Sequence, residues 1–226
     1  MTTAAIDTRL DFAKAIAAFR ALQANPDDTR QIFVIFRALR GKSGLKAWRR
    51  FQDSAVGRQV LAERRVLLDR LTDRAALAAL PDGSVGRAYL AFMEAENLSA
   101  DGLVMASQAD QEVLSPDIEL FASRMRDSHD LTHILSGYGR DALGELCLLA
   151  YMNRHSRNLG QLLIIAMSWL RIPAAWRAAI RQAWRDGGKA SCMMTLDYEA
   201  LLAQPLEPAR RELGIVEPTL YRAVTP

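Results

Sequence analysis

The chain has 226 residues, of which 50% are hydrophobic and 24% charged, and 29 Lys and Arg against 26 Asp and Glu leave a formal charge of +3. So high an apolar content excludes a predominantly disordered chain. The only cysteines, Cys147 and Cys192, exclude a disulfide scaffold and predict two buried thiols in a reducing compartment. We expect residues 1–27 to form an N-terminal helical extension and residues 28–222 to form one domain.

Good helix formers dominate the sequence and alternating β-branched runs are nearly absent, which predicts an all-α fold, a single-domain helical bundle. The segment after Asp28 has apolar residues at helical spacing, and we expect Gly41 to end that helix. A second helix is expected from about Val56 to Leu68. A third should end at Leu80, where Pro-Asp-Gly-Ser forms a turn.

The next expected helix faces the core with four side chains, Tyr89, Leu90, Phe92 and Met93. Residues 99–116 are polar and rich in turn formers, which indicates a long connection. Residues 118–135 are expected to form one helix, because apolar residues recur there at helical spacing. The glycines of Gly-Tyr-Gly at 137–139 should end it, and Asp141 should cap the helix that follows.

Further helices are expected at residues 159–170, 173–185, 189–202 and 207–213. The most apolar stretch, residues 159–170, falls short of the ~18 continuous apolar residues that a membrane span needs. The N-terminus has no basic start followed by an apolar secretory core, so we expect a cytoplasmic protein.

Charge is unevenly distributed along the chain. Arg30 to Arg74 contains 12 basic and 4 acidic residues, whereas Pro81 to Asp130 contains 3 basic and 10 acidic residues. Solvated helix faces that pair with the acidic half would explain the basic segment, and so would contact with anionic lipid or a phosphorylated ligand. No zinc finger, RNA-binding signature or aromatic-interleaved basic run accompanies it, so we expect no nucleic-acid partner.

The most informative stretch contains two of the three histidines. His129 and His133 are four residues apart, so on a helix their side chains lie one turn above the other, with Asp130 in the same arc of ~100°. Glu145 follows the glycine turn, and an antiparallel helix pair would return its carboxylate to the imidazoles. A lone helical histidine is usually a satisfied core residue, but this set suits Zn²⁺, Fe²⁺ or Mn²⁺ with open coordination positions.

Other metal enzymes fit the pattern less well. A zinc peptidase would have its general-base glutamate where Asp130 stands, and the shorter side chain is better suited to ligation or to orienting a ligand. The HD phosphohydrolases need an upstream histidine ligand, but no histidine precedes His129. The third histidine, His155, has no carboxylate near it in sequence and is expected to be a surface or cap residue.

One motif resembles the HDxxH-x11-E signature of the ubiquinone (coenzyme Q) biosynthesis protein 4 family. It consists of His129-Asp130-x-x-His133 followed, after eleven residues, by Glu145. Further segments resemble that family, namely Leu80 to Tyr89, Ser136 to Asp141, Trp184 to Lys189, Tyr198-Glu199, and Pro205 to Ile215. The resemblance covers roughly residues 28–222. It implies an all-helical fold in which the four signature residues bind a divalent metal between two adjacent helices, with zinc favoured over Mg, Mn or Fe.

The resemblance also implies a role in ubiquinone biosynthesis. The family is credited with removing the C1 carboxylate of a polyprenylated 4-hydroxybenzoate, coupled in some descriptions to hydroxylation there, which would make the chain a lyase. The alternative is a non-catalytic scaffold that binds lipid precursors and organises a biosynthetic complex. Asp130 and Glu145 are the candidate acid–base groups. Arg140 would hold a carboxylate or phosphate, unless it pairs at the surface with Asp141 or Glu145.

The resemblance implies a substrate with a prenyl chain that resides in a membrane, and the expected partners follow from this. They are the polyprenylated aromatic precursor, other ubiquinone biosynthesis enzymes, a second copy in a homodimer, and an anionic membrane surface. The expected location is the bacterial cytoplasm, peripheral to the inner membrane. Six cations are the candidate membrane contact, Arg37, Arg40, Lys42, Lys46, Arg49 and Arg50. Residues 146–151 and 159–170 are candidate walls for the prenyl chain.

Overall fold

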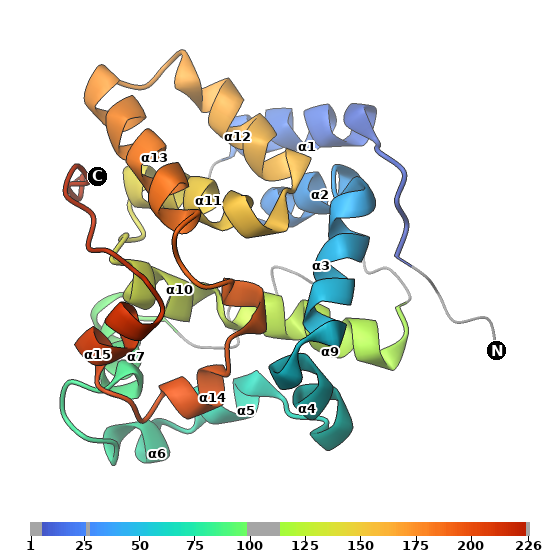
Figure 1. Ribbon diagram of the computed structural model, residues 1–226. Helices are drawn as coiled ribbons and strands as arrows, with labels where there is room; N and C mark the ends of the chain where they lie inside the picture. Colours follow the sequence, from blue (N-terminus) through green and yellow to red (C-terminus); the bar gives the residue numbers. More distant parts are fainter. Residues whose placement is uncertain (1–5, 26–27, 99–113, 225–226) are drawn as a thin grey trace.

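The computed structural model describes residues 6–25, 28–98 and 114–224, and in these residues the regular structure is helical (Figure 1). The all-α prediction is confirmed. An isolated antiparallel bridge joins Ser84 to Pro205. None of the helices in the described ranges is long and apolar enough to cross a bilayer.

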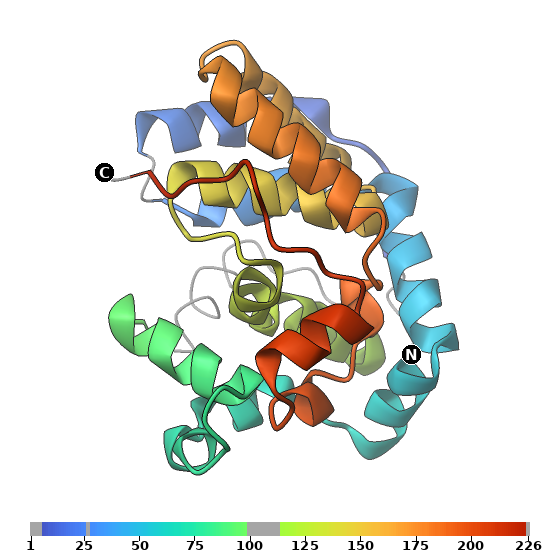
Figure 2. The same cartoon turned by 60° about the vertical axis from the view of Figure 1, so that its left-hand side comes forward.

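The helices form two layers with a helical segment between them (Figures 1 and 2). The upper layer consists of α1 (Phe12–Ala24), α2 (Arg30–Ala38), α11 (Ala142–Ser156), α12 (Leu159–Trp169) and α13 (Ala174–Gly187). The lower layer consists of α4 (Ala55–Glu63), α5 (Leu67–Thr72), α6 (Arg74–Ala78), α7 (Val85–Ala95), α14 (Tyr198–Leu201) and α15 (Leu206–Glu212). Along one side α3 (Gly41–Asp53) connects the layers, while α9 (Pro116–Asp127) and α10 (His129–Ser136) lie between them.

A continuous hydrophobic core holds the two layers together as one domain. Leu131 and Leu135 of α10 are fully buried in it, along with Tyr89 from α7 and Leu148 from α11. The extension predicted for residues 1–27 contributes as well, because α1 packs on α2 and its Phe19 joins the same core. Burial on both sides fixes α10 in the centre of the molecule.

The prediction of one helix from Val56 to Leu68 is wrong. Arg64 has a left-handed backbone with φ of 53°, which ends α4, and the chain is extended at Val66 before α5 begins. Gly41 was expected to end the helix after Asp28. In the structure α2 ends at Ala38, and Gly41, with φ of 50°, is the first residue of α3, which we did not predict.

Two further helix predictions need correction. The single helix expected over residues 118–135 is two helices, α9 and α10, separated by a turn at Ser128 with φ −81° and ψ 0°. The helix expected over residues 189–202 is a short 3-10 turn, η1 (Met193–Thr195), followed by α14. The connection expected over residues 99–116 falls mostly outside the described residues, and Pro116 begins α9.

The turn before α11 has the predicted structure. Gly137 adopts φ of 78°, a conformation that a side chain would strain, and it ends α10 after Ser136. The Asp141 carboxylate then accepts hydrogen bonds from the backbone N–H groups of Leu143 and Gly144 at 3.1 Å each, which caps α11. These two signals place α10 and the start of α11 beside each other.

Candidate metal centre

Three candidate metal ligands converge on one side of α10. The ligand atoms of His129, Asp130 and His133 all lie within 4.8 Å of one another. The Nε2 atoms of the two imidazoles are 3.1 Å apart, and the rings meet edge to face with centroids 4.7 Å apart. His133 and Asp130 are buried, whereas the His129 side chain is 36% exposed. One edge of the group is therefore accessible to solvent.

Glu145 approaches the same imidazoles from the first turn of α11. Its carboxylate oxygens lie 3.4 Å from Nε2 of His133 and 3.8 Å from Nε2 of His129. The glycine turn between α10 and α11 makes this approach possible, as the sequence predicts. The four signature residues are thus gathered at one place, with Asp130 from α10 and Glu145 from α11 supplying the carboxylates.

The orientation of His133 is set by a backbone group. Nδ1 of His133 lies 2.9 Å from the carbonyl oxygen of Tyr138, and because a carbonyl only accepts, Nδ1 carries the proton. Nε2 then faces His129 and Glu145, and it donates to the Glu145 carboxylate when the ring is protonated. Phe92 of α7 stacks on the His133 ring at a centroid distance of 6.1 Å and an angle of 21°. The buried ring is therefore held from both sides.

The charges around the centre shift its titrating groups in different directions. Burial would raise the pKa of Glu145, but the hydrogen bond to His133 and the charges of both imidazoles and Arg140 outweigh burial and hold it below its usual value. Burial would lower the pKa of His133, yet Glu145 and the Tyr138 carbonyl raise it overall. For His129 burial prevails and the pKa is lowered. Glu145 is accordingly a carboxylate at neutral pH.

The donor set fits a divalent metal. Two imidazole nitrogens bound tetrahedrally at ~2.0–2.1 Å from zinc would lie about 3.3 Å apart, close to the 3.1 Å between the Nε2 atoms here. The protonated Nδ1 of His133, hydrogen-bonded to a carbonyl, is the outer-shell arrangement that metal-ligating histidines adopt. The group can therefore hold a metal ion through His129, His133 and the neighbouring carboxylates.

Comparison with known proteins assigns the chain to a family. The sequence model of the family described as "Coenzyme Q (ubiquinone) biosynthesis protein Coq4" matches residues 10–219. The chain belongs to the Coq4 family. The family that includes this Coq4 chain is one of ubiquinone biosynthesis proteins.

Individual relatives agree with this assignment. The chain is 35% identical over 179 residues to the Bos taurus protein named "Ubiquinone biosynthesis protein COQ4 homolog, mitochondrial", covering 73% of this chain and 62% of the relative. The Danio rerio protein of the same name is 30% identical over 210 residues, which cover 90% of this chain and 76% of the relative. The match thus spans about three fifths of the cattle protein.

A solved structure has the same fold. It is the crystal structure of a putative ubiquinone biosynthesis protein from Nostoc punctiforme, with a TM-score of 0.65 and 20% sequence identity. The alignment covers 91% of this Coq4 chain and 98% of that one.

Arg140 of this Coq4 protein lies beside the centre. Its Nη1 is 3.5 Å from Oε2 of Glu96, and both side chains are partly exposed. Its charge also acts on Glu145 and His129, where it lowers the pKa of each. The predicted surface pairing is therefore with Glu96, a residue of the turn after α7, instead of Asp141 or Glu145.

Two residues that secure the centre were not found from the sequence. The hydroxyl of Tyr221 accepts from the backbone N–H of Gly139 at 3.0 Å and donates to the Asp141 carboxylate, so it ties the C-terminal segment to the turn before α11. Arg210 of α15 donates to the carbonyl oxygens of Ile134 and Leu135 at 2.7 and 3.0 Å, at the end of α10. Both lie more than 70 residues from their partners, so no local pattern reveals them.

The predictions for His155 and Cys192 need correction. His155 is half-buried, with its Nε2 shielded from solvent, and it lowers the pKa of the nearby Cys192 thiol, instead of being a surface or cap residue. Nη1 of Arg50 lies 3.7 Å from the Cys192 sulfur. Cys147 is buried as predicted, whereas Cys192 is only half-buried.

Proposed function

We propose that the chain is a metal-dependent decarboxylase that acts at C1 of a polyprenylated 4-hydroxybenzoate-type precursor, with zinc as the first metal to test. The observation that carries the proposal is the gathering of His129, Asp130, His133 and Glu145 at one partly accessible place. Membership of the Coq4 family supports the pathway.

The reaction defines what the site must do. Loss of CO₂ breaks the bond between C1 and the carboxylate carbon and leaves an electron pair at C1, which must take up a proton. If C1 is hydroxylated instead, an oxidant such as O₂ must accept electrons. When bound, a divalent metal would supply Lewis-acid stabilisation of the developing charge and a template for the ring carboxylate.

The two carboxylates have distinguishable roles in this proposal. Glu145 has a lowered pKa and two imidazole neighbours, which suits a carboxylate that binds metal or accepts a proton. Asp130 is buried beside His129 and is the second group that can hold a proton near the reacting ring. His133, held by Tyr138, keeps its Nε2 aimed between them.

Arg140 is the proposed substrate anchor. Its charge acts on both His129 and Glu145, and its contact with Glu96 at 3.5 Å is a weak and partly exposed pairing. A substrate carboxylate would offer this arginine a charge-assisted contact in exchange. The exchange would orient C1 toward the carboxylates and away from solvent.

The partners and location are proposals too. A polyprenylated precursor resides in a bilayer, so we propose a protein of the bacterial cytoplasm that is peripheral to the inner membrane and contacts anionic lipid. Successive steps on such a precursor favour contact with other ubiquinone biosynthesis enzymes. We propose a homodimer as the form to test, and no nucleic-acid partner.

The test is turnover by purified, metal-analysed protein of a prenylated 4-hydroxybenzoate, with the product at C1 identified by mass spectrometry. We expect turnover in the wild type and its loss, with loss of bound metal, in His133→Ala. His155→Ala is the matched control, because His155 lies outside the centre, and it should retain metal and activity. Precursor binding without any product would contradict the decarboxylase and support the scaffold.

A further inference from the structure

The outer face of α12 is apolar and partly exposed in the described part of the structure. Leu159, Leu162 and Met167 have exposed fractions of 41–44%, and Leu170, directly after the helix, is 86% exposed. At 100° per residue these four side chains lie within an arc of roughly 140°. An amphipathic helix of a soluble domain has charged residues on this side, whereas α12 has no charged residue at all. The sequence suggested the wall of an internal slot here, but this face of the stretch points outward.

The chain segment that contains this face has charges of one sign. Between Glu145 and Asp186 the chain contains six arginines and no Asp or Glu. Arg157 precedes α12, Arg171 follows it, and Arg181 lies on the neighbouring α13, and all three are exposed. Figure 1 shows α12 and α13 as an antiparallel pair at the upper edge of the molecule. A cationic rim therefore surrounds an apolar stripe.

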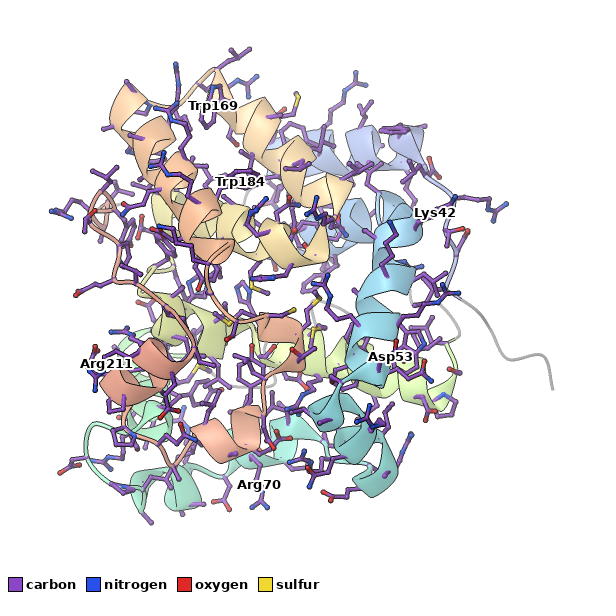
Figure 3. The ribbon with its side chains drawn as sticks, viewed as in Figure 1. Lys42, Asp53, Arg70, Trp169, Trp184 and Arg211 are labelled. Atoms are coloured by element: carbon purple, nitrogen blue, oxygen red, sulfur yellow. The ribbon has the colours of Figure 1, made fainter. Side chains whose placement is uncertain are left out.

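Two neighbouring features extend the face. The Arg181 guanidinium lies over the ring of Trp169 at 5.6 Å, near the end of α12, where Figure 3 labels this tryptophan at the upper edge. On the other side Leu163 of α12 packs against the Ala15 region of α1, and α1 itself exposes Phe12 and Ile16. Trp169 and the flanking arginines thus border the exposed leucines, and both side chains combine an apolar body with a polar tip that suits a water–lipid boundary.

We infer that the α12 face, defined as Leu159, Leu162, Met167, Leu170 and the flanking Arg157, Arg171 and Arg181, docks on an anionic bilayer surface. The inference rests on the proposed function in one respect, that the precursor is a lipid. The exposed leucines insert among the acyl chains and the arginines bind headgroup phosphates. The sequence suggested that basic residues on and before α3 contact the membrane. The inference assigns this contact to α12 instead.

Charge argues against a second copy as the occupant. In a two-fold interface the same patch meets itself, so the arginine rim of one copy would face the arginine rim of the other without a carboxylate between. An anionic bilayer provides both the apolar interior and the opposite charge. The lipid surface therefore fits both features of the face.

The test is flotation of the full-length protein with vesicles of phosphatidylcholine containing about a third phosphatidylglycerol. Leu162→Asp/Leu170→Asp should weaken binding about 10- to 100-fold. Arg171→Glu/Arg181→Glu should weaken binding to anionic vesicles, while the small binding to neutral vesicles stays unchanged. Val216→Asp, at a comparably exposed apolar residue in the C-terminal segment, is the matched control and should bind like the wild type.

Lys42→Glu/Lys46→Glu tests the competing surface on α3, where Figure 3 labels Lys42. Loss of flotation in this variant, with normal flotation of the leucine variant, would overturn the assignment to α12. So would a wild type that does not float. A dimer that dissociates in Leu162→Asp/Leu170→Asp, seen by light scattering, would assign the face to a second copy and also overturn it.

Retained helical circular dichroism and zinc affinity show that a variant is folded. If the double variant fails this check, Leu170→Ser replaces it, because Leu170 is almost fully exposed. Flotation needs no turnover. A protein that is inactive but binds vesicles through α12 would therefore contradict the proposed decarboxylase but not the assignment of membrane binding to the α12 face. Turnover of a detergent-dispersed precursor by a leucine variant that does not float would support both.

Discussion

The carbonyl oxygen of Tyr138 accepts a hydrogen bond from Nδ1 of His133 at 2.9 Å, and this single contact joins the turn between α10 and α11 to the centre of the molecule. It fixes which ring nitrogen of His133 carries the proton and which one faces Glu145. The position of the turn therefore determines how well the centre is formed. Groups that hold the turn are expected to control metal affinity from a distance.

Tyr221 is the clearest of these groups. Removal of its hydroxyl in Tyr221→Phe leaves the Gly139 N–H and one Asp141 oxygen without their partner. We expect zinc affinity to fall about 10- to 100-fold, as for other groups that orient metal ligands, with unchanged helical content. Competition with a chromophoric chelator measures the affinity, and the absorption spectrum of the cobalt-substituted protein reports ligand geometry.

Arg222→Ala is the control for this variant, because Arg222 donates only to nearby carbonyls of the same segment. It should bind zinc like the wild type. Equal zinc affinity and equal cobalt spectra for Tyr221→Phe and the wild type would show that the hydroxyl does not position the centre.

Gly144 provides a second test of the turn. A Cβ at this position would collide with the carbonyl of Gly139, so Gly144→Ala must push the turn away from α11. We expect a loss of stability of about 1–3 kcal/mol, as for overpacking, together with weaker zinc binding. Urea titration measures the free energy of unfolding. In the control variant Gly44→Ala the added methyl meets only the flexible side chain of Arg40, so the free energy of unfolding should change less. Full stability of Gly144→Ala would contradict the close approach.

The ion pair between Arg124 and Glu199 is buried, with both guanidinium–carboxylate distances at 2.6 Å. Glu199→Ala would leave the Arg124 charge buried without its partner, and we expect a loss of about 3–5 kcal/mol in the free energy of unfolding. Asp117→Ala, which breaks an exposed pair with Arg64, should cost less than about 1 kcal/mol. Equal urea midpoints for the two variants would exclude a structural role for the buried pair.

The candidate metal centre was predictable from the sequence because its geometry is local. His129 and His133 share a helix face by spacing alone, and the signals at Gly137 and Asp141 return the chain so that Glu145 meets them. The break at Ser128 was not predictable, because only this residue departs from the helix. The backbone N–H of Ser128 still donates to the carbonyl of Arg124, and that of Thr132 to the carbonyl of Ser128. The pattern of apolar residues therefore continues across it.

Tertiary contacts override local propensity in the segment expected to be helical at 189–202. The Ser191 N–H donates to the carbonyl of Leu213, and the buried Tyr198 hydroxyl donates to the carbonyl of Met193. Both bonds compete with helix continuation. The positions of Tyr221 and Arg210 depend on contacts across 75 or more residues, for which a single sequence contains no signal.

Cys192 should be the more reactive of the two thiols. Burial would raise its pKa, but hydrogen bonds from His155 and Arg50 prevail and lower it to about 7, whereas burial raises the pKa of Cys147 to about 12. The thiolate is the nucleophile, so the rate of alkylation by iodoacetamide at Cys192 should rise with pH, reach half its maximum near pH 7 and level off at higher pH. Peptide mass mapping over a pH series measures both sites.

In His155→Ala the midpoint of the pH dependence of Cys192 alkylation should move to higher pH. The alkylation rate at pH 7 should fall about tenfold because the thiolate fraction falls. A Cys192 rate that still rises steeply above pH 8 in the wild type would contradict the contact with His155 and Arg50. Labelling of Cys147 at a comparable rate in folded protein would contradict its burial.

Arg140 should affect substrate binding more than the chemical step. Arg140→Ala removes the guanidinium that we propose for the substrate carboxylate, and the loss of a charge-assisted hydrogen bond should raise KM about 10- to 100-fold with a smaller change in kcat. Arg140→Lys keeps the charge without the planar fork and should lie between the alanine variant and the wild type. Glu96→Gln frees the guanidinium from its observed partner, so KM should fall or stay constant. An unchanged KM in Arg140→Ala would show that the carboxylate is bound elsewhere in the centre.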